Sequence, residues 1–479
     1  MRRSLRLLLP LLAALAGSAP SPVPPRKTSA ALDARLREAQ PGDAHAVFVY
    51  FRDKAGAPAE SVSPRALLRR ARRGRAQGAA SFEDRPLPEA YVRAVEARTL
   101  RLRQRLRWLN AVSAFATRQQ IAELQALPFV ERLDVVKGFR RGPVEPSEDA
   151  ATAAGRRAAA DEQPHAINYG SSLGQVQQIG VPTLHDRGLH GEGVIVAVLD
   201  AGFDNLAHEA FATLNVLAAH DFVNGDDDVG NGGDRGEGSH GTATLSVLGG
   251  FRDGELIGPA FAATFLLAKT EDTDSETKVE EDNWAAADEW AEALGADVIS
   301  SSLGYLEFDR GQPSYSFADM DGRTAVVTRA AELAAERGVV VVNSAGNEGF
   351  NGSHNTLVAP SDGAHVLAVA AVTSAGTRAG FSSVGPSADG RIKPDVAAQG
   401  QSVKVAGSRA GEYRLANGTS FSCPLTAGAL ALVLQARPEL SADEVLAVVR
   451  GSARRAATPD SLTGYGIVDA AAAVDARRP

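Results

Sequence analysis

Cysteine is nearly missing from this chain of 479 residues, which holds only Cys423. A single cysteine cannot form an intrachain disulfide, so the core and the polar contacts must hold the fold together. A reducing compartment would explain this shortage, and so would a fold large enough to need no covalent staple. With 44% hydrophobic and 23% charged residues, the chain has a globular composition and can bury a large core.

Long hydrophobic runs are also missing after the first residues. No later stretch reaches about 18 apolar residues, so we expect no transmembrane helix. Residues 1–19 are typical of a secretory signal peptide, with Arg2, Arg3 and Arg6 ahead of an apolar core and small residues at 16–19. No cysteine lies near residue 20, so we expect no lipid anchor and predict export to the periplasm or the medium.

Charge is divided unevenly along the chain. Residues 20–165 hold 26 Lys and Arg against 17 Asp and Glu, whereas residues 166–479 hold 21 against 41. The two parts would therefore attract each other, unless each simply has a solvated surface. Nucleic-acid binding is not expected, because the arginines of the basic part are interleaved with apolar helix positions.

The basic part is predicted to be a small α+β domain. Residues 20–45 should be a flexible lead-in, and the arginine-rich residues 64–80 should be exposed. Strands are expected at residues 45–51, 110–117 and 130–136, and helices at 86–106 and 118–127, the first with Tyr91, Val95, Leu102 and Leu106 on one face. Residues 142–164 are polar, and their Arg156-Arg157 pair is either a processing site or two solvated arginines.

From about residue 170 strands and helices alternate, which predicts an α/β domain with a parallel sheet and helices on both faces. Strands are expected at residues 194–199, 264–269, 297–301, 339–342 and 366–372, and helices at 280–294, 323–336, 420–437 and 442–452. Ligand chemistry in such sheets lies at the carboxyl ends of the strands. Asp200, Ser302 and Asn347 each follow such an end.

Three short stretches carry candidate chemistry. Residues 417–424 deliver Ser420 to the first turn of a long, nearly uncharged helix, where the helix dipole stabilises negative charge. Taken alone, Ser420 could equally be an N-cap. Asp200 ends a buried strand, and His240 begins a helix of small residues. The order Asp, His, Ser is one of the orders in which a Ser-His-Asp triad occurs.

With these stretches, the sequence resembles the subtilisin-like serine protease family over about residues 175–474. Further matching motifs are Ser302-Leu303-Gly304, Ser344-Ala345-Gly346-Asn347-Glu348-Gly349, residues 381–386 and residues 464–468. The resemblance implies an endopeptidase with Ser420 as nucleophile, His240 as general base and Asp200 orienting the imidazole. It also implies that Asn347 donates to the oxyanion together with the backbone N–H of Ser420.

The resemblance also implies a substrate-binding site made of Ser302, Leu303, Gly304, Ala345 and Gly346. The first three would pair with an extended substrate, and the last two would form the other wall of the specificity pocket. Val358 replaces the glycine that many relatives have at the pocket floor and would narrow the pocket. Glu348 would lie near the rim, where it would favour basic or disfavour acidic side chains.

The sequence departs from the family at several positions. Ala201 follows the predicted aspartate, and Ser239 precedes the predicted histidine. Leu425 and Thr426 follow residue 424. None of these four departures removes a chemical group that the mechanism requires. Cys423 lies about 300° around the helix from Ser420, so we reject it as the nucleophile.

No cofactor is needed for this chemistry. Two loops, one with Asp226, Asp227 and Asp228 and the other with Asp319 and Asp321, are rich in carboxylates, which indicates either at least one structural calcium site or acidic turns. The loop at residues 249–258 is too short to keep the family's calcium loop.

The domains are predicted as a signal peptide at residues 1–19, a propeptide at 20–165 and a catalytic domain at 166–479. A strand-helix-strand module before such a domain resembles the inhibitory propeptides of subtilases. We therefore expect a secreted zymogen that acts on proteins and peptides, inhibits itself through its propeptide, and cuts itself between about residues 150 and 172. Two alternatives stay open: a catalytically silent peptide-binding fold, and an esterase or acyl transferase that uses the same site.

Overall fold

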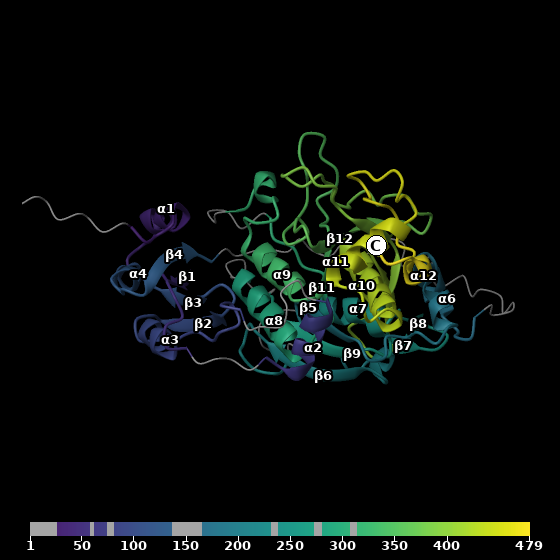
Figure 1. The fold of residues 1–479 in the computed structure, drawn as a ribbon, viewed down its shortest axis with the longest axis horizontal. Coiled ribbons are helices and arrows are strands. Elements are labelled where there is room, and N and C mark those ends of the chain that lie inside the picture. The colour runs from purple at the N-terminus through teal and green to yellow at the C-terminus, as the bar shows by residue number, and fades with distance from the viewer. Residues whose placement is uncertain are drawn as a thin grey trace, which may run out of the picture.

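The structure is a computed structural model that describes residues 26–57, 62–73, 81–136, 165–230, 238–272, 280–306 and 314–479. The predicted signal peptide, most of the predicted linker and Arg156-Arg157 lie outside the described residues. Figure 1 shows a small sheet at one end of the molecule and a larger part built around a second, longer sheet. This arrangement agrees with the predicted α+β and α/β parts.

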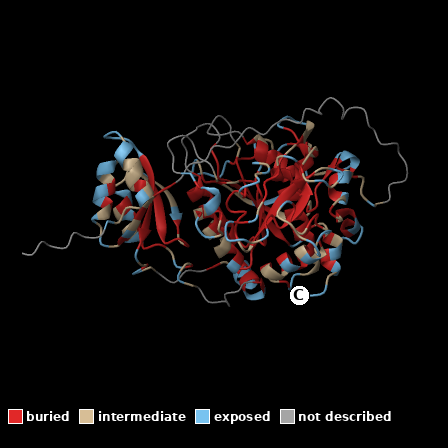
Figure 2. Ribbon diagram, turned by 90° about the horizontal axis from the view of Figure 1, so that it is seen from above, coloured by how far each residue is buried: buried red, intermediate tan, exposed pale blue. Residues whose placement is uncertain are grey.

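The small sheet is antiparallel, with the strand order β2-β3-β1-β4. Its strands are β1 (His45–Phe51), β2 (Arg101–Leu106), β3 (Ala111–Ala116) and β4 (Val130–Val135), and its helices are α1 (Ala30–Glu38), α3 (Glu89–Glu96) and α4 (Arg118–Gln125). Strand β1 is buried on both faces: Val47, Val49 and Phe51 join the core of the small part, whereas Phe48 and Tyr50 pack against the large part. Figure 2 shows the buried strands of the small sheet in red.

Two predictions for the small part are wrong. Residues 86–106 are a short helix, α3, followed by strand β2, because Leu102 and Leu106 pair with Ala114 and Ala111 across the sheet. The alternating arginines at 101, 103 and 105 are a strand pattern that the helical spacing concealed. Residues 20–45 are not only a lead-in, since α1 begins after Ser29, whose hydroxyl accepts from the backbone N–H of Leu32 at 3.1 Å.

The prediction that residues 64–80 are exposed is wrong for three of their arginines, whereas Arg65 and Arg72 are exposed as predicted. Residues 64–73 form helix α2 (Pro64–Arg73), in which Arg69, Arg70 and Arg73 are buried. Figure 1 shows α2 apart from the small sheet, beside helix α8 (Glu281–Leu294) of the large part. Carboxylates of the large part neutralise these arginines, which explains their burial.

The large part contains a parallel seven-stranded sheet with the order β13-β12-β11-β10-β5-β9-β6. The strands are β5 (Ile195–Asp200), β6 (Asn215–Asp221), β9 (Thr264–Lys269), β10 (Val298–Ser301), β11 (Val340–Ser344), β12 (Val366–Val372) and β13 (Val396–Gln399). The five predicted strands are confirmed; β6 and β13 were missed. Strand β5 is apolar on both faces, because Val196 and Val198 join one core and Ile195, Ala197 and Leu199 the other.

Helices cover both faces of this sheet, as predicted. Helices α7 (Ser239–Gly249), α10 (Thr419–Ala436) and α11 (Ala442–Ser452) contribute to one core, and α8 and α9 (Val326–Glu336) contribute to the other. The remaining elements are α5 (Leu173–Gln177), α6 (Val181–His185), α12 (Ala470–Asp475), and the hairpins β7 (Phe251–Arg252) with β8 (Leu256–Ile257) and β14 (Val403–Ala406) with β15 (Tyr413–Ala416).

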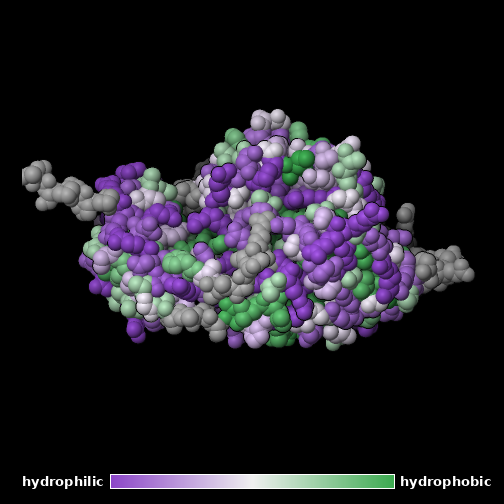
Figure 3. All heavy atoms as spheres, in the orientation of Figure 1, coloured by the Kyte–Doolittle hydropathy of each residue, from purple (hydrophilic) through white to green (hydrophobic). Residues whose placement is uncertain are grey.

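Helix α10 is the one described helix that is long and apolar enough to cross a membrane. It is 89% buried inside the large part, so it is the core helix of this domain. The face of the molecule drawn in Figure 3 is mainly hydrophilic, with hydrophobic residues gathered in small patches. Both observations agree with the burial of the apolar segments seen in Figure 2.

Candidate active site

The carboxylate of Asp200 lies fully buried at the carboxyl end of β5 and receives donors on both oxygens. Its Oδ1 accepts from the backbone N–H of Ala201 at 2.8 Å and lies 2.5 Å from Nδ1 of His240. Its Oδ2 accepts from the hydroxyl of Thr244 at 2.8 Å. The carboxylate is thus held in a fixed orientation that faces the imidazole.

His240 lies in the first turn of α7, and a close approach of this helix to β5 brings it to Asp200. A Cβ on Gly241 would lie 2.1 Å from the carbonyl oxygen of Gly202, so only glycine fits beside the histidine. The imidazole is 7% exposed, and its ring lies 6.0 Å from the ring of Phe421. The predicted histidine is therefore next to both the aspartate and the start of α10.

Ser420 is the second residue of α10, whose N-cap position is taken by Gly418. The alternative that Ser420 serves only as an N-cap is therefore wrong. Its Oγ lies 3.4 Å from the carbonyl oxygen of Ser302, and the hydroxyl of Ser302 donates to the carbonyl oxygen of Ser420 at 2.8 Å. These contacts fix the first turn of α10 against the end of β10.

Asn347 lies on the loop after β11, exposed and beside the start of α10. Its Oδ1 accepts from both the backbone N–H and the hydroxyl of Thr419, each at 2.9 Å. These bonds fix which end of the amide faces the helix and leave Nδ2 as the available donor. A Cβ on Gly418 would lie 3.6 Å from this Nδ2, so the donor is next to the turn that leads to Ser420.

The predicted walls of the specificity pocket face each other across Val358. A Cβ on Gly304 would lie 2.2 Å from Cγ2 of Val358, and one on Gly346 would lie 2.9 Å from Cγ1. Ala345 belongs to the same wall as Gly346, and its carbonyl oxygen accepts from the backbone N–H of Val358 at 3.2 Å. The side chain of Val358 therefore fills the space between the two glycines.

The other predicted residues near this pocket are also placed by the fold. Leu303 is 3% exposed, and its carbonyl oxygen accepts from Nδ2 of Asn343 at 3.0 Å. Glu348 is exposed, and its backbone N–H donates to the hydroxyl of Ser383 at 3.1 Å. All nine predicted site residues thus lie along the carboxyl ends of β5, β10 and β11 or at the starts of α7 and α10.

Cys423 lies one turn into α10 and is completely buried. Its Sγ lies 3.4 Å from the carbonyl oxygen of Ser301 and 3.5 Å from that of Val342. Burial raises the pKa of this thiol to about 12, which outweighs the hydrogen bonds that favour the thiolate. The neutral, enclosed thiol is unsuited to act as a nucleophile.

The carboxylates considered for calcium are used by their own turns. The carboxylate of Asp226 accepts from the backbone N–H of Asp228, and that of Asp228 accepts from the backbone N–H of Gly230. The carboxylate of Asp319 accepts from the backbone N–H of Ser316, and that of Asp321 accepts from the backbone N–H of Arg323. Among the described residues, no group of three or more His, Cys, Asp or Glu side chains could hold a metal ion. A structural calcium site therefore stays a prediction from the sequence.

Thr244 is a residue of the candidate site that the sequence analysis missed. It lies four residues after His240 on the same helix, which places both side chains on one face. That spacing is a usable signal once Asp200 and His240 are paired, but a threonine in a helix of small residues carries no signal alone.

Comparison with known proteins now defines the class of the molecule. A family model described as the subtilase family matches residues 191–466, and a model described as a peptidase S8 propeptide domain of Bacteroidota matches residues 46–151. The first match covers more than half of the chain, so the protein belongs to the subtilase family. Its small N-terminal part is correspondingly similar to the propeptides of that family.

Among curated relatives, subtilisin NAT of Bacillus subtilis subsp. natto is 33% identical over 281 residues. That alignment covers 58% of this chain and 64% of the relative, so it spans less than two thirds of subtilisin NAT. Subtilisin BL of Lederbergia lenta is 31% identical over 298 residues, covering 62% of this chain and 97% of the relative.

Among solved structures, fervidolysin of Fervidobacterium pennivorans, a keratinolytic enzyme related to subtilisin, has a TM-score of 0.63 at 23% identity. The match covers 92% of this chain and 63% of that one, and it supports the fold alone. A protease of Pseudoalteromonas arctica has a TM-score of 0.50 at 26% identity, with 64% of this chain and 98% of that chain covered.

Proposed function

We propose that the protein is a serine endopeptidase that uses Asp200, His240 and Ser420 as its catalytic triad. The observation that carries this proposal is the 2.5 Å contact between Nδ1 of His240 and the buried Oδ1 of Asp200. It fixes the tautomer, so that Nε2 of the imidazole is left to act as the base. Family membership and the position of Ser420 at a helix start support the same assignment.

The reaction would proceed through an acyl-enzyme. His240 takes the proton of Ser420 as its Oγ attacks the peptide carbonyl, and then protonates the leaving amine. The oxyanion would accept hydrogen bonds from the backbone N–H of Ser420 and from Nδ2 of Asn347, whose orientation Thr419 fixes. Water then attacks the acyl group by the reverse sequence and frees the enzyme.

We also propose that the protein is a secreted, self-processing zymogen with a signal peptide at residues 1–19, a propeptide at 20–165 and a catalytic domain at 166–479. The packing of the small sheet against α8 and α9 supports the inhibitory role of the propeptide. The carboxylate of Glu289 on α8 accepts from the backbone N–H groups of Arg107 and Trp108 at 3.1 and 3.0 Å. Cleavage is expected between about residues 150 and 172.

Active-site labelling with a sulfonyl fluoride tests the assignment of the nucleophile. The full chain, after incubation to allow processing, should be labelled on Ser420, and Ser420→Ala should take up no label. Cys423→Ala is the matched control, since it should be labelled like the wild type. Label on another residue, or a labelled Ser420 with hydrolysis of esters but of no peptide or protein, would contradict an endopeptidase.

A further inference from the structure

Helix α2 and residues 81–85 form an arm of the propeptide. Helix α2 lies apart from the small sheet, whereas residues 81–85 are held to the small part by Lys54, whose ammonium donates to the carbonyl oxygens of Phe82, Glu83 and Arg85. The arm docks where helices α8 and α9 end and strands β5 and β10 begin, through contacts to Gly193, Asp297 and Arg337. Asp200 lies at the other end of β5, about 20 Å away along the strand direction. The small sheet contacts the start of α8, where Arg103 donates to the carboxylate of Asp282 at 2.8 Å, so the propeptide contacts the large part at two separate places (Figure 1).

The arginines of α2 lie on one face of the helix. Arg65, Arg69 and Arg73 are spaced by four residues, and Arg70 lies beside them, whereas the side chain of Arg72 is exposed at the edge of this face. The four inward arginines meet a set of acceptors that we call the arginine site. It consists of the carboxylates of Glu292 and Asp297 and the carbonyl oxygens of Gly295, Ala296 and Arg337.

Arg69 occupies the centre of the arginine site. Its guanidinium donates to the carbonyl oxygen of Ala296 at 2.7 Å and to those of Glu292 and Arg337 at 3.2 and 3.3 Å, and it pairs with the carboxylate of Glu292. These carbonyl groups belong to the C-terminal ends of α8 and α9, where the helix dipoles favour a cation. The site is thus built for a guanidinium group rather than for a point charge.

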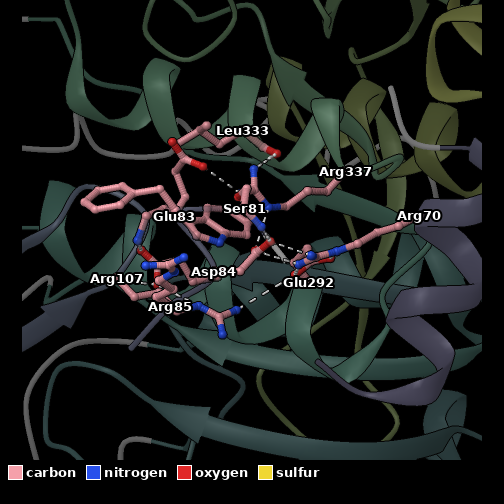
Figure 4. Close-up of polar contacts among 12 residues, drawn as sticks. Arg70, Ser81, Glu83, Asp84, Arg85, Arg107, Glu292, Leu333 and Arg337 are labelled. Carbon is pink, nitrogen blue, oxygen red and sulfur yellow. Dashed lines mark hydrogen bonds and ion pairs between the residues drawn. The ribbon is translucent and has the colours of Figure 1, made fainter. Parts of the chain in front are cut away.

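Arg70 joins the arm to the catalytic domain through two carboxylates (Figure 4). It donates to both oxygens of Glu292 at 2.8 and 2.7 Å, and to Asp84 of the arm at 2.8 Å. Arg337 of the catalytic domain donates to the same Asp84 at 3.2 Å. Burial opposes the ionisation of Asp84, but Arg70 and Arg337 outweigh it and lower its pKa to about 2.

The carboxylate of Asp297 binds the arginines near the two ends of α2. Arg65 donates to its Oδ2 at 2.7 Å and Arg73 to its Oδ1 at 2.9 Å. Oδ2 also accepts from the backbone N–H of Ile195 at 2.9 Å, which fixes the carboxylate at the start of β5. Because the catalytic domain itself orients this acceptor, the site does not depend on the arm for its shape.

We propose that the arginine site is a second binding site for the propeptide, remote from the catalytic triad, and that its occupant is the arm. The arm keeps the propeptide on the catalytic domain after the chain between them has been cut. The site recognises the arm through four arginines of α2, which bind the carboxylates of Glu292 and Asp297 and the carbonyl oxygens at the ends of α8 and α9. Of this proposal, only the statement that the chain is cut rests on the proposed function.

The test uses a chain that cannot process itself, so that it does not depend on catalysis. A recognition sequence for a foreign site-specific protease is inserted among residues 137–164 of the full chain carrying Ser420→Ala. After cutting, the two pieces are held together only by non-covalent contacts, and the rate of their dissociation is measured on an immobilised catalytic domain. Arg69→Ala with Arg70→Ala is compared with Arg72→Ala, which removes an exposed arginine of α2.

The double variant should dissociate on the order of 100-fold faster than Arg72→Ala, because truncating a buried charged partner acts on the off-rate. Glu292→Gln should speed dissociation similarly and should add little to the double variant, since both changes break the same contacts. If the double variant does not fold, Arg70→Gln replaces it, with an expected acceleration of more than about tenfold. Dissociation within about twofold of the Arg72→Ala control would overturn the proposal.

Discussion

Thr244 donates its hydroxyl to Oδ2 of Asp200 at 2.8 Å, from the turn of α7 that follows His240. In the proposed mechanism Thr244 is a positioning residue, because its hydroxyl fixes the carboxylate that would orient the imidazole and it does not touch the reacting atoms. Helix α7 would then supply both the base and a support for the orienting acid.

Thr244→Val removes this donor while it keeps the shape of the side chain. We expect kcat to fall about tenfold with little change in KM, since the carboxylate loses one of its donors. The acid limb of the pH–rate profile should move to higher pH, because a less hydrogen-bonded Asp200 stabilises the imidazolium more strongly. Thr244→Ser should restore both quantities. A loss of kcat with an unmoved acid limb would show that Thr244 is only structural.

Val358 fills the space between Gly304 and Gly346, so the pocket should accept only small side chains. Val358→Gly should raise kcat/KM for substrates with Leu or Phe before the cleaved bond by about 10- to 100-fold relative to Ala. Libraries of peptide substrates that vary at this one position measure the ratio. An unchanged ratio in a variant with a wild-type melting temperature would place the specificity pocket elsewhere.

Cys423 should resist thiol reagents in the folded protein, because its side chain is enclosed and burial raises its pKa to about 12. We expect a mercurial or disulfide reagent to leave the activity of the processed protein unchanged over minutes and to react fully after denaturation. The reagent's uptake is followed by mass spectrometry, with Cys423→Ala as the control. Rapid inhibition that Cys423→Ala abolishes would mean that the thiol is open to the active site.

His185 should make the catalytic domain sensitive to acid. Its Nδ1 lies 2.7 Å from the hydroxyl of Tyr169 and its Nε2 2.7 Å from the carbonyl oxygen of Pro259, so the neutral ring accepts at one nitrogen and donates at the other. Burial lowers the pKa of His185 to about 4, against a small opposing effect of the hydrogen bond to Pro259. The unfolded chain then binds more protons than the folded one at pH values between the two pKa values.

Stability should therefore be full above about pH 6.5 and decline as the pH falls toward 4, by about 2 kcal/mol at pH 4.5. Urea unfolding of the full chain carrying Ser420→Ala, at pH 7 and pH 4.5, measures this loss without self-digestion. His185→Gln should be less stable at pH 7 but lose less on acidification. An equal loss in both proteins would assign the acid sensitivity to other groups.

The sequence predicted the fold of the large part well because its signals are local. The apolar run that ends in Asp200 is typical of a buried strand, and β5 is that strand. Asn347 and Ser420 were found from their motifs, and both lie at the start of α10 in space. Strands β6 and β13 were missed, since neither residues 215–221 nor 396–399 form a long apolar run.

The propeptide was predicted less well because its contacts are distant in sequence. Arg70 is buried where Glu292 lies opposite it, 222 residues further along the chain. No local pattern distinguishes such an arginine from Arg72, which is exposed on the same helix. The unequal charge of the two parts did indicate their attraction, and the arginine site is one place where oppositely charged groups of the two parts meet.

The most direct test of the account is the intact mass of the purified full chain beside that of Ser420→Ala. We predict that the wild type converts to a chain that begins between residues 150 and 172, while Ser420→Ala stays whole. That result would identify Ser420 as the nucleophile of a self-processing zymogen. Cleavage of both proteins at the same position, or of neither, would contradict self-processing by this triad.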